Sequence, residues 1–191
     1  MIINFQLAVD TALLKWCKIH KRWPENILYY RDGVAESQYE ELLRDEVSLI
    51  ERAWDAVAAR RQENVPAPPP LKVTTVIVTK RHSTRFFPTK AADSMPNNEN
   101  CHPGTLVDSV ITSPYFSDFF LQTQNAIKGT ARPSHYFVLN NGMGITMTEL
   151  QQLVRLPSFP QNTMLTLASQ THNLCHTYVR ATMGVSYAPP A

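Results

Sequence analysis

Cysteine is scarce in this sequence, with Cys17, Cys101 and Cys175 the only thiols in 191 residues. They are widely spaced, odd in number and form no Cys-x-x-Cys pair, so free thiols in a reducing compartment are favoured over a disulfide framework. Cys175 has His172 and His176 nearby, but a zinc site needs a second pair at ligand spacing, which is lacking. Core packing is therefore the expected role of Cys175.

Net charge and long apolar runs are also lacking. The formal net charge is only +2, which is too small to indicate nucleic-acid binding by itself, so any basic surface must be local. The apolar runs are too short for a membrane span, and no basic segment precedes an apolar one at the N-terminus. We therefore expect a soluble protein of the cytoplasm, with the nucleus as a second location and no membrane partner.

One stretch of bulky residues, Ile27 to Tyr30, predicts a strand that is buried on both faces of a mixed or parallel sheet. Gly33 supplies a turn after it, and Ser37 with Glu40 has the spacing of a capping box that opens a helix. Asp32 is thus expected at the carboxyl end of a strand, where open α/β sheets hold ligands and where a carboxylate suits a divalent metal. The alternative is a carboxylate that satisfies backbone amides at a helix N-terminus.

The rest of the chain alternates between helical and strand patterns. Apolar residues spaced by three and four predict helices over residues 4–21 and 37–61, and Val73 to Thr79 is the clearest strand. The other predicted segments are a stiff Pro-rich connector at 64–71, a mobile Asn-rich loop at 91–103, strands at 104–111, 115–121 and up to 139, and helices at 148–153 and 171–182. The pattern indicates an α/β fold.

Basic residues are concentrated after the clearest strand. Between Lys72 and Lys90 there are five Lys or Arg residues and no acidic residue. Lys80 and Arg81 directly follow the end of the buried strand, which makes this segment a candidate site for a phosphate backbone. The alternative is a solvated loop.

Five stretches together resemble, in the same order, the PIWI domain of eukaryotic Argonaute proteins. They are Tyr30–Gln38, Thr79–Phe87, Pro103–Asp108, Gly129–Tyr136 and His172–Thr182. The resemblance covers nearly the whole chain. It implies an RNase H-like α/β fold with a mixed sheet flanked by helices, here as a partial PIWI domain over residues 1–191 in which the N-terminal strands and the final helix are missing.

The resemblance also implies a function, which is binding of a small guide RNA and its target RNA in RNA silencing. Family members that cleave RNA hold two divalent metals, Mg²⁺ or Mn²⁺, with an Asp-Glu-Asp-His set. Asp32 matches the second Asp, as a catalytic and metal-binding residue. The other three positions would fall before Met1 and beyond Ala191. Because one carboxylate cannot hold two metals, we expect no RNA cleavage by the chain as given.

By the same match, six residues are expected to contact the guide backbone near its 5′ end and seed. They are Lys80, Arg81, Arg132, Tyr178, Arg180 and Ser186. Arginine forks and a hydroxyl suit phosphate oxygens, and His82 and Arg85 are expected helpers. The alternatives are a core aromatic for Tyr178 and a structural ion pair for Arg132.

Other positions depart from the family. In its members, pockets for Trp-containing silencing partners lie beside the first strand and second helix; Val57 is hydrophobic at one matched position, but Arg22, Trp23 and Arg61 match poorly. The MID domain that builds most of the 5′-phosphate pocket is lacking. Residues 154–170 have no period and are interpreted as an insertion, as from a translated intron. The alternative function is therefore a truncated product or protein-interaction module that keeps part of the fold.

Overall fold

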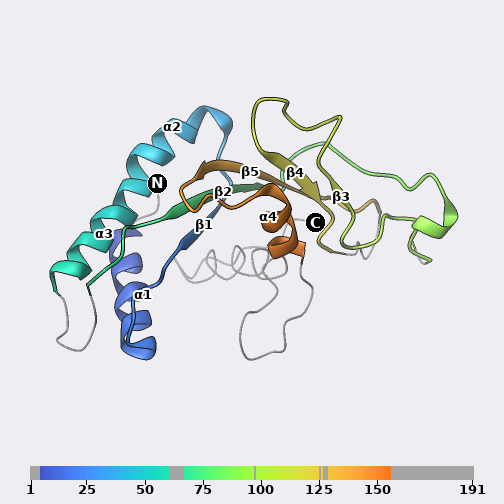
Figure 1. Ribbon diagram of the computed structural model, residues 1–191. Coiled ribbons are helices and arrows are strands. Elements are labelled where there is room, and N and C mark those ends of the chain that lie inside the picture. The colour runs from blue at the N-terminus through green and yellow to red at the C-terminus, as the bar shows by residue number, and fades with distance from the viewer. Residues whose placement is uncertain (1–4, 61–66, 97, 125, 127–128, 156–191) are drawn as a thin grey trace, which may run out of the picture. The chain divides into compact units, whose positions relative to one another are not determined.

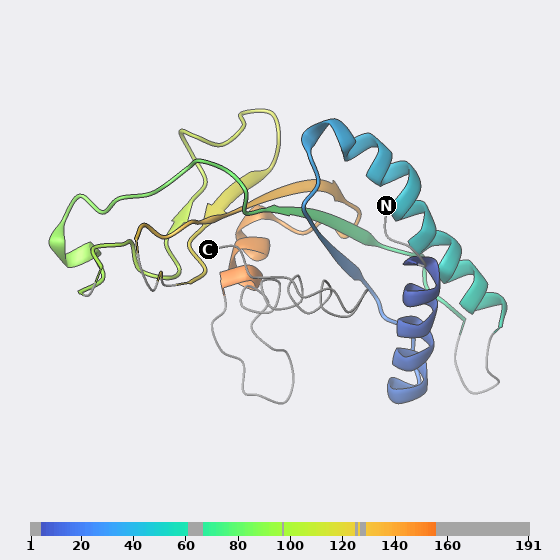
Figure 2. The same cartoon turned by 180° about the vertical axis from the view of Figure 1, so that it is seen from behind.

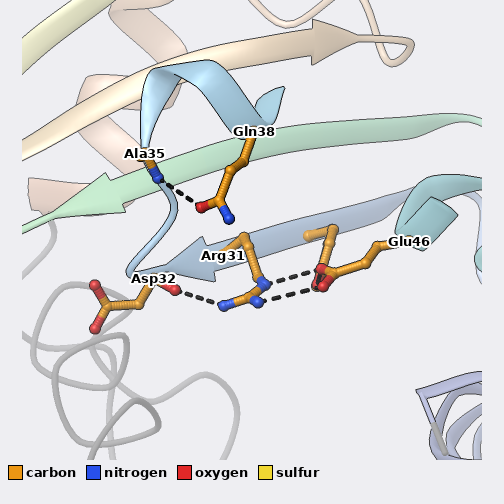
Figure 3. Close-up of polar contacts among 6 residues, drawn as sticks. Arg31, Asp32, Ala35, Gln38 and Glu46 are labelled. Carbon is orange, nitrogen blue, oxygen red and sulfur yellow. Dashed lines mark hydrogen bonds and ion pairs between the residues drawn. The ribbon is translucent and has the colours of Figure 1, made fainter. Parts of the chain in front are cut away.

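The computed structural model describes residues 5–60, 67–96, 98–124, 126 and 129–155 (Figure 1). Five strands form one sheet in the order β1-β2-β5-β4-β3. They are β1 (Ile27–Asp32), β2 (Val73–Thr79), β3 (Leu106–Val107), β4 (Asp118–Leu121) and β5 (Ser134–Asn141). β1 and β2 run in the same direction and β5 in the opposite one (Figure 3), so the predicted mixed sheet is confirmed.

The chain forms two compact units, and each is described by itself. Of the described residues, the first unit comprises those within 5–76 and 139–144, and the second comprises those within 77–138 and 145–155. β2 and β5 each contribute residues to both units.

Two helices build the core of the first unit. α1 (Phe5–His20) and α3 (Ser48–Ala59) lie side by side in both views (Figures 1 and 2). Leu13 and Cys17 from α1 pack with Trp54 and Val57 from α3, and the Trp54 ring lies 5.0 Å from that of Trp23. Both predicted helices are confirmed, although α1 buries only two of its residues, so its apolar stripe is narrower than the sequence suggested.

The second predicted helix is not uniform. It runs as a 3-10 turn (Glu36–Gln38), α2 (Tyr39–Leu42), a π-helical segment (Leu43–Val47) and then α3. The prediction of a capping box formed by Ser37 and Glu40 is wrong, because the helical segment begins earlier, at Glu36. The Ala35 N–H donates to the Gln38 side-chain oxygen over 3.2 Å instead. A π-helical segment widens the turn locally and is frequent at functional sites.

Burial differs between the first two strands. β2 is buried along nearly its full length, as its sequence predicts. Every residue of β1, by contrast, is only half-buried. The expectation that Ile27 to Tyr30 are buried on both faces is therefore wrong, since β1 is the first strand in the sheet order and has one described neighbour.

The second unit contains an antiparallel ladder. β4 pairs with β5, with Phe119 opposite Tyr136 and Phe120 opposite His135. One face of this ladder is fully buried, and on it the rings of Phe119 and Tyr136 stack at 5.0 Å and 9°. The predicted strands at 104–111 and 115–121 are present but shorter, because residues 109–117 form a loop.

α4 (Met147–Arg155) closes the described part of the second unit. Thr146 and Glu149 form a capping box that the sequence analysis missed: the Thr146 N–H donates to Glu149 over 2.9 Å, and the Glu149 N–H donates to the Thr146 hydroxyl over 3.2 Å. These bonds lower the pKa of Glu149 below its usual value. Val154, expected at the start of an insertion, is a fully buried residue of α4; residues 156–170 lie outside the described part.

The described residues of the Asn-rich segment at 91–103 include short elements that were not predicted. It contains a 3-10 turn at Ala91–Asp93 and a β-bridge between Ser94 and Cys101. Cys17 and Cys101 are free, as expected; both are also buried, and burial raises the pKa of both thiols. Within the described segments, no helix has the length and apolarity that a bilayer crossing needs.

Gly142 gives a first testable prediction. Its N–H donates to the Val73 carbonyl over 2.9 Å, and a Cβ at this position would clash with the same carbonyl oxygen. Gly142→Ala should therefore lower the free energy of unfolding by about 2–3 kcal/mol, the upper part of the range for overpacking, measured by urea denaturation. Gly144→Ala is the control, because a Cβ there meets open space and costs only the left-handed backbone, about 1 kcal/mol. Equal losses in the two variants would contradict the clash.

Candidate nucleic-acid interface

Asp32 is the last residue of β1, so its predicted position at the carboxyl end of a strand is confirmed. Its side chain is half-buried. Figure 3 shows the Asp32 carboxylate pointing away from the Arg31 guanidinium, while the Arg31 Nη1 donates to the Asp32 backbone carbonyl. Arg31 therefore holds the backbone of Asp32, and the Asp32 carboxylate points away from Arg31.

Arg31 is itself held by a buried carboxylate from the π-helical segment. The Arg31 Nε donates to Glu46 Oε2 over 2.8 Å, and the Tyr29 hydroxyl donates to the same oxygen over 2.7 Å. Burial raises the pKa of Glu46, but the bonds from Arg31 and Tyr29 outweigh it, so the pKa lies below its usual value. The lowered pKa keeps Glu46 ionised, and no pattern in the sequence pointed to this residue.

The described residues do not form a metal site around Asp32. Within the described ranges, no three His, Cys, Asp or Glu side chains come together as ligands for an ion. Two-metal sites need several ligands that converge on ions about 4 Å apart. The donor set present therefore does not fit the pair of divalent cations that the resemblance implies.

The second unit joins the two segments that carry three of the predicted basic residues. His82 Nε2 lies 3.0 Å from the Pro133 carbonyl oxygen, which fastens the loop after β2 to the turn before β5. Lys80 and Arg81 belong to the first segment and Arg132 to the second. We call these three residues the basic cluster.

Burial and neighbours decide the charge within this cluster. Arg81 and Arg132 are exposed, and Lys80 is half-buried. Burial lowers the pKa of His82, and the cations Arg85 and Arg132 add to this effect, although the bond to Pro133 opposes it. The lowered pKa favours the neutral form of His82, and the expected helper Arg85 donates to the carbonyls of His82 and Thr84.

Asn100 is a further residue that the sequence analysis missed. It is buried, its amide donates to the Gly129 carbonyl over 2.9 Å, and its oxygen accepts from the Ala131 N–H over 2.8 Å. These bonds fix the turn that presents Arg132. Asn100 lies in a segment with several asparagines, so its composition indicated only a loop.

Three of the six predicted RNA contacts, Tyr178, Arg180 and Ser186, lie outside the described residues, as do Cys175 and Arg61. The positions matched to a pocket for tryptophan are described in part. Val57 and Trp23 are buried in the α1–α3 core, and Arg22 is exposed beside Glu25. Neither buried side chain offers a surface to a partner's tryptophan.

A protein-family model described as "Piwi domain" matches residues 1–191. Among curated relatives, argonaute 18 of Oryza sativa subsp. japonica is 38% identical over 172 residues, covering 89% of this chain and 13% of the relative. Argonaute 5 of Arabidopsis thaliana is 40% identical over 171 residues, covering 88% and 14%. Argonaute-2 of Drosophila melanogaster is 36% identical over 169 residues, covering 88% and 12%. The chain thus spans 12–14% of the length of these relatives.

Solved structures resemble it as well. The C-terminal lobe of a budding yeast Argonaute superposes with a TM-score of 0.71 at 29% identity, covering 81% of this chain and 32% of that one. An Argonaute of Kluyveromyces polysporus with a guide RNA gives 0.70 at 29% identity, covering 81% and 19%. Both likenesses agree with the RNase H-like sheet and flanking helices.

Proposed function

Because the chain belongs to the Piwi domain family, we propose that it binds a small guide RNA and its paired target through their phosphate backbones, in Argonaute-type RNA silencing. The observation that carries this proposal is the hydrogen bond between His82 and Pro133, since it joins Lys80 and Arg81 to Arg132 on one unit. The likeness to an Argonaute that holds a guide RNA supports the same function. Its place of action would be the cytoplasm, with the nucleus as a second location.

The chemistry of the basic cluster suits sequence-independent binding. Arginine presents a planar fork of N–H donors that pairs with two phosphate oxygens, and lysine adds a point charge. Such contacts position a nucleic acid but carry no sequence information, which base pairing between guide and target would supply. His82 and Asn100 would hold the backbone segments that carry the cations in place before RNA arrives, through their hydrogen bonds to backbone groups. The protein would therefore lose less conformational entropy on binding RNA.

Three alanine substitutions test the cluster. The variant with Lys80→Ala, Arg81→Ala and Arg132→Ala should bind a short 5′-phosphorylated RNA at least tenfold more weakly, because each substitution leaves one phosphate without its cation. In fluorescence anisotropy at several salt concentrations, the slope of log K against log salt should become less negative by about 0.7 for each phosphate that the variant no longer neutralises.

Lys90→Ala is the matched control, since Lys90 is an exposed cation of the same unit outside the cluster. It should change RNA affinity only slightly. Equal losses for Lys90→Ala and for single variants of the cluster would mean that net charge alone attracts RNA, and the assigned site would be wrong.

RNA cleavage is not part of this proposal. The Asp32 carboxylate has a fitting position, but the described donor set does not fit a metal pair. Arg31 and Glu46 would hold the backbone of Asp32, whatever further ligands a longer protein brings to it.

A further inference from the structure

A second feature of the second unit lies outside the function proposed so far. Residues 109–117, here called the aromatic loop, follow Asp108 in the connection from β3 to β4 and contain no charged side chain. Four of its large apolar side chains are exposed: Val110 at 99%, Tyr115 at 88%, Phe116 at 62% and Ile111 at 49%. A contiguous exposed apolar segment of this kind marks an interaction site more often than a single exposed residue does.

The aromatic loop has a defined conformation. Val110 has a φ of +69°, and the Ile111 N–H donates to the Ser109 carbonyl over 2.8 Å, as in a γ-turn with positive φ. This conformation is strained for a β-branched residue, and strain in an exposed loop points to function rather than to packing. The Ser113 hydroxyl accepts from the N–H groups of Tyr115 and Phe116 over 3.2 and 3.3 Å.

The buried carboxylate of Asp118 ties the loop to the sheet through hydrogen bonds. The Ser113 N–H donates to Asp118 Oδ1 over 2.8 Å, and the other oxygen of Asp118 lies 2.6 Å from His135 Nε2. The Phe116 ring lies 5.5 Å from that of Phe137, which is directly opposite Asp118 in the ladder. The loop therefore presents its aromatic rings from a fixed base.

The same face of the ladder continues to the basic cluster. His135 and Phe137 are two residues apart on β5, so their side chains point to one side of the sheet. The His135 ring stacks on Phe120 at 4.3 Å and lies 6.5 Å from the ring of His82, which fastens the basic cluster. The Phe116 ring and the His82 ring, whose segment carries Lys80 and Arg81, thus lie along one side of the β4–β5 ladder in the same unit.

We propose that Tyr115 and Phe116 stack on unpaired bases of the RNA whose phosphates the basic cluster holds. This inference rests on the proposed function. Proteins that bind single-stranded nucleic acid combine a cationic path for the backbone with aromatic side chains on which bases stack without sequence preference. The fixed base of the loop favours such stacking, because the rings lose little conformational freedom on binding.

The test compares a single-stranded RNA with an abasic RNA of the same length, measured by fluorescence anisotropy with the whole chain. Changing Tyr115→Ala and Phe116→Ala together should weaken binding of the normal RNA by about tenfold or more. The abasic RNA should bind the wild-type chain and the variant equally, because its phosphates remain and its stacking partners are gone. Tyr115→Trp should keep the full affinity.

Phe87→Ala is the matched control, since Phe87 is a 70% exposed aromatic residue of the same unit outside the loop. It should leave the affinity for both RNAs unchanged. The single variant Tyr115→Ala should fold normally, since this side chain is 88% exposed, so a loss of its RNA affinity would not come from misfolding. The wild-type chain failing to bind either RNA would overturn the proposed function.

Normal binding with no loss in the loop variants would overturn only the stacking role. A loss of equal size on abasic RNA would overturn it too. Sedimentation of wild type and variant covers a further outcome: a dimer that becomes a monomer, with RNA affinity unchanged, would make the loop an interface between copies and refute base stacking.

Discussion

Replacing Glu46 with alanine is expected to lower the free energy of unfolding by about 3 kcal/mol, the lower end of the range for breaking a buried ion pair. Glu46 is 4% exposed, and its loss would strand the Arg31 guanidinium and the Tyr29 hydroxyl, which both donate to it. The lower end applies because water reaches 22% of the Arg31 side chain. Urea denaturation of the two proteins measures the difference.

Asp45→Ala is the matched control, one residue earlier on the same π-helical segment. Asp45 pairs with Arg44 at 2.9 Å, but that arginine is 74% exposed, so water and salt screen the pair. Its removal should hardly change stability. A Glu46→Ala variant as stable as Asp45→Ala would show that the Arg31 network does not support the first unit.

The Glu46 carboxylate also makes the free energy of unfolding depend on pH. The pKa of Glu46 is lower in the folded state than in the unfolded chain, so the unfolded chain binds the extra proton on acidification. The stabilising contribution is therefore complete above the unfolded value of about 4.3 and declines as the pH falls through the lower folded value. The stability gap between wild type and Glu46→Gln should accordingly narrow below about pH 4.

The part of the fold that the sequence predicted is the part with local patterns. The stripe of apolar residues at helical spacing located α1 and α3, and seven consecutive β-prone residues located β2 at the bounds that the structure has. The burial of β1 could not be predicted in this way. A run of bulky residues looks the same in a central strand and in a strand with one neighbour, since strand order depends on contacts that are distant in sequence.

Residues of the candidate interface also differ in whether a local sequence pattern reveals them. Lys80 and Arg81 were singled out by the run of charges in one stretch, and Arg132 by the resemblance to the family. Asn100 was not, because its role is to accept from and donate to a turn about thirty residues away. Glu46 was missed for the same reason, since helical spacing shows which face a residue lies on but not which strand residue it meets.

Phe119→Ala should be the most damaging change in the second unit, with a loss of about 3–5 kcal/mol in the free energy of unfolding. Phe119 is fully buried and stacks on Tyr136 at 5.0 Å, so alanine would leave a cavity against the face of that ring. Urea denaturation followed by tyrosine fluorescence measures the loss. Phe119→Leu keeps most of the volume and should lose less.

The control for this prediction is again Phe87→Ala, which removes the same side chain from a position that is 70% exposed. It should stay within about 0.5 kcal/mol of wild type. Because Phe119 points to the face opposite that of Phe120 and His135, the destabilised Phe119→Leu variant should retain its RNA affinity while losing stability. A loss of RNA affinity together with stability would mean that the two faces of the ladder are coupled. The basic cluster would then depend on the packing of Phe119 against Tyr136.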